Sequence, residues 1–292
     1  MANKQGSMKR NRAISNFFAY LALVIIVIIW LFPFVGLVLG SFRSYDSAVE
    51  YGGIVDYVIP KHFSLDNYRF VLSGQTNYIR WYINTVVIAF FVAALQTIIV
   101  LCVSYALSRM RFTGRTALMR FWLVLGMFPG FLTMICLYFL LKEMGLTQAG
   151  AIPGLILVSV ASSGMGYYVC KGYFDTIPKA LDEAARIDGA SRARVFFTMT
   201  IPMSKPIIIY TALVAFMAPW NDYVFASYIA FGHDTSYNVA VSMYRWMNTG
   251  DYQGYFTRFC AGGVLVAIPV TLLFMFLQKY YVEGVTGGAV KG

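Results

Sequence analysis

Charged residues are scarce in this chain. Asp, Glu, Lys and Arg make up 12% of the sequence, whereas a soluble domain carries about 25%. Hydrophobic residues make up 59%, and they are gathered in long runs, which places the chain in the membrane class. The net charge is +10, but the cations lie between the apolar runs. They therefore indicate membrane topology rather than a nucleic-acid surface.

Residues suited to catalysis or metal binding are also few. The sequence has two histidines, His62 and His233, and no catalytic constellation, which disfavours a membrane-embedded enzyme. No Walker A pattern occurs, so we expect no P-loop for ATP. The four cysteines lack paired spacing and favour buried small apolar side chains over disulfides or metal ligands. They are Cys102, Cys136, Cys170 and Cys260.

Apolar stretches of membrane-spanning length dominate the rest of the chain. A bilayer core needs about 20 apolar residues per helix. Six stretches fit: 17–42, 84–108, 118–141, 150–173, 206–231 and 260–280. The fourth is interrupted by glycines and serines, which spans tolerate and which allow close helix approach. The sequence therefore predicts an all-α polytopic membrane protein with six transmembrane helices. The first stretch is too long for a cleaved leader and reads as a retained anchor.

The distribution of Lys and Arg predicts the orientation. Sixteen of the 23 fall on the side that holds both termini and seven on the other. By the positive-inside rule, the N- and C-termini are cytoplasmic. The expected order is a cytoplasmic segment 1–16, a first transmembrane helix 17–42, an extracytoplasmic loop 43–83, a five-helix core 84–280 and a cytoplasmic tail 281–292. The core includes a cytoplasmic loop 174–205 and an extracytoplasmic loop 232–259.

A charged segment, residues 176–205, interrupts the apolar pattern. Its residues 179–187 are mostly good helix formers. Gly189 follows them where a left-handed cap is expected. Ser191 then has the place of an N-cap for a second short helix, which Pro202 is expected to stop. The segment is predicted to be a helix–turn–helix hairpin in the cytoplasm.

The first helix of this hairpin has two distinctive features. Asp182 and Arg186 are spaced i, i+4 and are expected to pair. A narrow small-residue face lies beside Asp182 and Glu183, formed by Ala180, Ala184 and Ile187. Such a helix fits a groove on another protein. A solvated amphipathic connector explains the pattern equally well from physics alone.

Polar residues within the spans are candidates for a translocation path, because polar groups in lipid tend to face a cavity or a partner helix. The candidates are Gln96, Ser104, Trp220, Asn221, Asp222 and Tyr223. Aromatic faces stack on sugar rings and amides bond hydroxyls. The alternative for Asp222 is capping or snorkelling near the outer interface. The alternative for Gln96 and Ser104 is hydrogen bonding between helices.

The hairpin resembles the EAA loop of binding-protein-dependent ABC importer permeases. Glu183-Ala184-Ala185 is followed after three residues by Gly189, and Ile201-Pro202 stands where that family has Leu-Pro. Met199 replaces the usual Ile, so both departures keep an apolar side chain. The resemblance implies that this loop docks on a cytoplasmic ATPase subunit. Its coupling residues would be Glu183, Ala184, Ala185, Gly189 and Pro202.

The C-terminal residues 278–292 are similar to the ending of MalG-like subunits of maltose-type carbohydrate importers, and 63–69 matches more loosely. This likeness implies that the tail also reaches the ATPase pair, through Gly287, Gly288 and Lys291. Without this likeness, the glycines would favour a disordered tail.

The resemblance implies a permease subunit of an ATP-driven carbohydrate importer, with malto-oligosaccharides as the favoured substrates. Its partners would be a second homologous permease subunit, two ATPase subunits and an extracytoplasmic solute-binding protein in a prokaryotic cell membrane. The chain would need no cofactor, since ATP and Mg belong to the ATPases. The alternative is an ion-coupled secondary transporter. It is disfavoured because no acidic residue falls at the centre of a span and no inverted repeat is evident.

Overall fold

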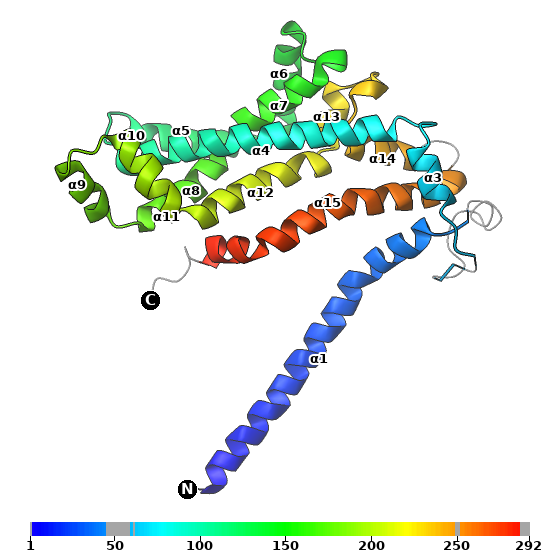
Figure 1. The fold of residues 1–292 in the computed structure, drawn as a ribbon, viewed down its shortest axis with the longest axis horizontal. Coiled ribbons are helices and arrows are strands. Elements are labelled where there is room, and N and C mark those ends of the chain that lie inside the picture. Colours follow the sequence, from blue (N-terminus) through cyan, green and yellow to red (C-terminus); the bar gives the residue numbers. More distant parts are fainter. Residues whose placement is uncertain (1, 45–58, 61, 249–251, 287–292) are drawn as a thin grey trace. The chain divides into compact units, whose positions relative to one another are not determined.

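The computed structural model describes residues 2–44, 59–60, 62–248 and 252–286. These residues are overwhelmingly helical and include no β-strand, as the sequence predicts (Figure 1). An isolated antiparallel bridge joins Arg43 to Phe63. The chain forms two units, one from residues 1–73 and 246–264 and the other from 74–245 and 265–292.

The first unit contains α1 (Ala2–Ser41), α3 (Asp66–Leu72) and the beginning of α15 (Tyr252–Thr286). Asn67 of α3 is buried and holds these elements together. Its amide donates to the carbonyls of Ser41 at 3.2 Å and Arg43 at 2.6 Å, and it accepts from Thr257 at 2.9 Å. The apolar side chains of α1 are largely uncovered; Trp30, for example, is 71% exposed. That exposure suits a helix whose solvent is lipid.

The second unit is built around α4 (Tyr78–Arg109), which packs against α7, α8 and α12 (Figure 1). The other helices in chain order are α5 (Arg115–Gly126), α6 (Gly130–Glu143), α7 (Ala151–Ala161), α8 (Gly164–Thr176), α9 (Lys179–Ile187), α10 (Arg192–Val195), α11 (Ile201–Met203), α12 (Lys205–Asn221), α13 (Val224–Ile229) and α14 (Val239–Asn248). A π-helical turn, η2, covers Phe196–Thr200. The 3-10 turns η1 and η3 cover Gln148–Gly150 and Asp234–Ser236.

Three helices are by themselves long and apolar enough to cross a membrane: Ile14–Ser41, Tyr78–Arg109 and Tyr255–Gln278. Three further spans arise if each of three bent pairs counts as one, giving up to six among the described residues. The α5–α6 pair bends by 100°, the η1/α7–α8 pair by 41° and the α10/α11–α12 pair by 82°. The span expected over 118–141 is thus made of two helices, α5 and α6, rather than one. Pro129 explains the break, because the residue before a proline is driven out of the helical region.

Small residues bring the helices of the second unit together. A Cβ added at Gly166 of α8 would lie 3.5 Å from Val100 of α4. One added at Gly154 of α7 would lie 2.2 Å from the carbonyl oxygen of Leu146. Gly166 thus contacts a neighbouring helix, whereas Gly154 packs tightly against the connection that precedes η1. The prediction for the cysteines is half right: Cys170 and Cys260 are buried, but Cys102 and Cys136 are exposed.

Candidate coupling site and membrane path

The hairpin α9–α10 has the local structure that its sequence predicts. Helix α9 runs from Lys179 to Ile187. Gly189 has φ +82°, the left-handed conformation that favours glycine. The Oγ of Ser191 then accepts the N–H of Arg194 at 3.2 Å and begins α10. Two short helices are therefore joined by a defined turn rather than by a loose connector.

Pro202 does not end the second helix as expected. It lies inside α11, directly after the π-helical turn η2, in which the N–H of Ile201 donates to the carbonyl of Phe196. Proline has no N–H to donate back to the carbonyl four residues earlier. The π-helical turn before Pro202 accommodates the missing donor, and helical structure continues to Met203.

Arg109, the last residue of α4, fastens the hairpin to the membrane helices. Its Nε lies 3.0 Å from Oδ2 of Asp182 in α9, and the two side chains are 5% and 17% exposed. Its Nη2 donates to the carbonyls of Phe174 and Ile177 at 3.0 and 2.8 Å. Phe174 lies in the last turn of α8, where its carbonyl also accepts the N–H of Ile177 at 3.2 Å, and Ile177 directly follows the helix. One guanidinium therefore links α4, α8 and α9.

The predicted pairing of Asp182 with Arg186 is wrong, because Asp182 pairs with Arg109 instead. An i, i+4 pair on an exposed helix is worth only about 0.2–0.5 kcal/mol. A guanidinium already fixed by two carbonyls is the better partner, since it presents its remaining N–H groups without further loss of side-chain freedom.

Further contacts join the second half of the hairpin and the end of α8 to α4. The hydroxyl of Tyr105 donates to the carbonyl of Arg192 at 3.3 Å, and its ring packs 4.7 Å from that of Phe196. Ser108 donates to Oδ1 of Asp175 at 2.6 Å. Tyr105 and Phe196 belong to a buried apolar cluster with Phe174, Cys170 and residues of α4. The hairpin is thus packed against the end of α4.

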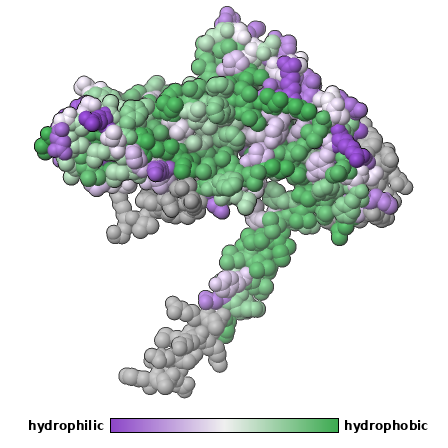
Figure 2. Space-filling model, in the orientation of Figure 1, coloured by the Kyte–Doolittle hydropathy of each residue, from purple (hydrophilic) through white to green (hydrophobic). Residues whose placement is uncertain are grey.

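Several residues of α9 that make none of these contacts are uncovered. Glu183 and Ala184 are exposed, Ala185 is half-buried, and Ile187 is 87% exposed. Hydrophilic residues gather at this end of the second unit (Figure 2). A rigidly mounted helix with an exposed carboxylate and an exposed isoleucine offers the chemistry of a docking element.

The residues predicted for the translocation path do not form one site. Ser104 is buried and donates to the carbonyl of Tyr167 at 3.1 Å, which is a bond between helices. Trp220 is buried beside the rings of Tyr82 and Phe216. Gln96 is half-buried.

The remaining path candidates lie at or just beyond the end of α12. Asp222 accepts the N–H of Phe225 at 3.2 Å at the start of α13, in the capping role that was the alternative. Asn221 is exposed, and its amide donates to the carbonyl of Met217 at 3.4 Å. The ring of Tyr223 packs 4.1 Å from that of Tyr244. Of the other predicted contacts, Gly287, Gly288 and Lys291 lie outside the described residues.

A hollow that the sequence reasoning missed lies beside two helix breaks. It has a volume of about 840 Å³ and is lined by residues around the α5–α6 and α7–α8 breaks, among them Trp122, Met127, Ser162, Tyr167 and Tyr168. The rings of Trp122 and Tyr167 lie 4.9 Å apart. Gly126-Met-Phe-Pro-Gly130 and Ser162-Ser-Gly164 are the signals that could have located it, since interrupted hydrophobic segments mark binding sites in transporters.

Residues 99–287 match a family described as the binding-protein-dependent transport system inner membrane component. The chain belongs to this family. It is therefore the membrane component of a transport system, and the matched range includes the whole α9–α10 hairpin and both helix breaks.

Several related permease proteins match this chain over nearly their whole lengths. The galactooligosaccharides transport system permease protein GanQ of Bacillus subtilis is 36% identical, covering 98% of this chain and 99% of the relative. The maltodextrin permease protein MdxG of the same organism is 34% identical over 96% and 98%. MalG of Salmonella typhimurium, a maltose/maltodextrin permease protein, is 30% identical over 94% and 95%.

The fold of this membrane component also matches a solved structure. A crystal structure of a bacterial ABC transporter involved in the import of the acidic polysaccharide alginate aligns with a TM-score of 0.80. The alignment covers 93% of this chain and 98% of that chain at 22% identity. The fold is thus that of an ABC importer permease.

Proposed function

We propose that this chain is one of two transmembrane subunits of an ATP-driven importer that receives oligosaccharides from an extracytoplasmic binding protein. The named relatives carry galactooligosaccharides and maltodextrins, and they match this chain from end to end. Malto-oligosaccharides are therefore the first substrates to test. The chain performs no covalent chemistry, since ATP and Mg are held by two partner ATPase subunits.

The membrane arrangement proposed is six spans, three of them bent, with both termini in the cytoplasm. The excess of Lys and Arg on that side supports it. The loops 43–83 and 232–259 then face the binding protein. The tail, with Gly287, Gly288 and Lys291, remains a proposed second contact with the ATPases.

Coupling is proposed to run through α9. Its exposed face, with Glu183, Ala184 and Ile187, docks in a groove of an ATPase subunit, and Gly189 sets the turn behind it. The observation that carries this proposal is the Arg109 link, which ties α9 to both α4 and α8. When the ATPases close on ATP, movement of α9 shifts these two helices and exposes the path to the opposite side of the membrane.

The hollow lined by Trp122, Tyr167 and Tyr168 is the proposed contact surface for sugar. Its aromatic faces suit sugar rings, and its position at helix breaks supports the assignment. Gln96, Ser104, Trp220, Asn221, Asp222 and Tyr223 stay as the proposal made from sequence; they are not among the residues that line this hollow.

Glu183→Lys tests the coupling proposal. We expect membrane insertion to be unchanged and sugar-stimulated ATP hydrolysis to be abolished, because the exposed carboxylate on the docking face is replaced by a cation. The matched control is Glu143→Lys, an exposed glutamate at the end of α6. Wild-type hydrolysis in the Glu183 variant would contradict the coupling role.

A further inference from the structure

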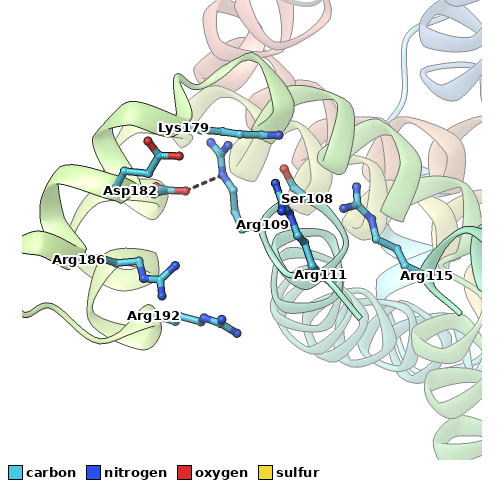
Figure 3. A pocket seen from close by; sticks show the side chains of 9 residues that line it. Ser108, Arg109, Arg111, Arg115, Lys179, Asp182, Arg186 and Arg192 are labelled. Atoms are coloured by element: carbon cyan, nitrogen blue, oxygen red, sulfur yellow. Dashed lines mark ion pairs between the residues drawn. The ribbon is translucent and has the colours of Figure 1, made fainter. Parts of the chain in front are cut away.

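A polar cavity of about 360 Å³ lies between the end of α4, the α4–α5 connection and the α9–α10 hairpin (Figure 3). Ligand pockets fall in the range of about 300–1,000 Å³. Its lining includes the carboxylates of Asp182 and Glu183. Six cations outnumber them: Arg109, Arg111, Arg115, Lys179, Arg186 and Arg192. Figure 3 shows Arg111 and Arg115 on one side of the space and Arg186 and Arg192 on the other.

The charges of this basic cavity are unbalanced within the described residues. Asp182 pairs with Arg109. The other five cations form no ion pair with any described residue. Cations gathered around a shared space repel one another unless an anion enters it. The cavity thus has the charge of an anion site.

Arg109 supplies an independent observation. Its side chain is 5% exposed, and Nη1 is buried without a hydrogen-bond partner in the described chain. Nη2 donates to the two carbonyls at the end of α8, and Nε has the ion pair with Asp182 but forms no hydrogen bond of its own. A buried N–H group that lacks a partner is costly, so a group that enters the cavity and accepts from it would be favoured.

We propose that the basic cavity binds a phosphate group, carried either by an anionic phospholipid or by a soluble phosphate. Arginine forks match phosphate oxygens, and basic pockets at the cytoplasmic ends of membrane helices hold lipid headgroups.

An adjoining shallow hollow points to the lipid source. It shares Arg111 and Arg115 with the cavity and adds Phe112 and Arg120. Phe112 of this hollow is 45% exposed, and Phe121, next in sequence to Arg120, is 57% exposed. An anionic headgroup in the cavity would leave its acyl chains free to lie along these apolar side chains.

The test is binding of a fluorescent short-chain phosphatidylglycerol to the assembled transporter in a neutral detergent. We expect saturable binding that falls at least about tenfold in the double variant Arg111→Gln/Arg192→Gln, since two charge-assisted hydrogen bonds are lost. The matched control is Arg194→Gln, an exposed arginine of α10 that does not line the cavity. Its binding should equal that of the wild type. Thermal unfolding of all three proteins checks that each is folded.

Competition experiments distinguish a lipid headgroup from a soluble phosphate as the source of the bound phosphate group. Displacement by unlabelled phosphatidylglycerol but not by inorganic phosphate supports the lipid headgroup, whereas displacement by inorganic phosphate supports a soluble ligand. Two results would overturn the site: equal binding by the wild type and the double variant, or equal displacement by phosphatidylcholine, which carries no net charge.

Discussion

Arg109 concentrates several contacts in one side chain. It ends a long membrane helix, pairs with Asp182 at 3.0 Å and satisfies two carbonyls of α8. Removing one partner of a buried ion pair leaves the other charge uncompensated, which costs about 3–5 kcal/mol. Replacing both partners by apolar residues costs far less, because no charge is then left buried.

Arg109→Met should therefore destabilise the protein by about 3 kcal/mol and uncouple ATP hydrolysis from transport. The double variant Arg109→Met/Asp182→Leu should recover much of the stability without recovering the coupling. The measurements are thermal unfolding and the ratio of sugar transported to ATP hydrolysed. The control is Asp66→Asn, which breaks an exposed pair of 3.7 Å with Arg69 and should cost at most about 1 kcal/mol. Normal coupling in the double variant would contradict the link.

At the residue scale, the sequence predicted the local conformation of residues whose role depends on their neighbours in the chain. Gly189 and Ser191 have the conformation and the cap that their types and spacing predict. The partner of Asp182 was not predictable, because Arg109 is distant in sequence and only the tertiary fold brings it close. Local spacing favoured Arg186, which the structure leaves facing the basic cavity.

Glycines of this chain's helices lie at close contacts at defined points. Gly154 of α7 is the tightest of these, since an added Cβ would meet the carbonyl of Leu146. Hydropathy located the apolar stretches but is insensitive to bends, so the α5–α6 and α7–α8 breaks and the hollow beside them were not predicted. The Gly, Pro and Ser residues at these breaks carry the signal, which hydrophobic averaging removes.

Gly154→Ala should lower the stability of the protein by about 1–3 kcal/mol, because the new Cβ would lie 2.2 Å from a backbone oxygen that cannot move freely. The comparison is Gly172→Ala in α8, where nothing lies within 4 Å. That change should be neutral or stabilising by up to about 1 kcal/mol, from the better helix propensity of alanine. Equal stability of the two variants in thermal unfolding would refute the packing role of Gly154.

At the scale of the whole molecule, we propose that the hollow at the helix breaks contacts substrate and that the exposed face of α9 contacts the ATPase. Composition and the spacing of the hairpin were enough to predict the class of protein. The hollow itself was not predictable, since it is made by residues from separate helices at their breaks.

Trp122→Ala should reduce the affinity for transported oligosaccharide about two- to tenfold, because an aromatic face of the hollow is lost. The concentration dependence of uptake measures it. Trp30→Ala, which removes an exposed tryptophan of α1, serves as the control and should leave uptake unchanged. An unaltered half-saturating concentration in the Trp122 variant would remove the hollow from the path.

The central claim is that α9 docks on an ATP-binding subunit, and cross-linking from its exposed face tests this most directly. A photo-reactive amino acid at Ile187, which is 87% exposed, should form an adduct with the ATPase in the assembled transporter. The same group at Leu72 of α3, which is 50% exposed, should form none. The account predicts an ATPase adduct from Ile187 alone; no adduct from Ile187, or equal adducts from both positions, would contradict it.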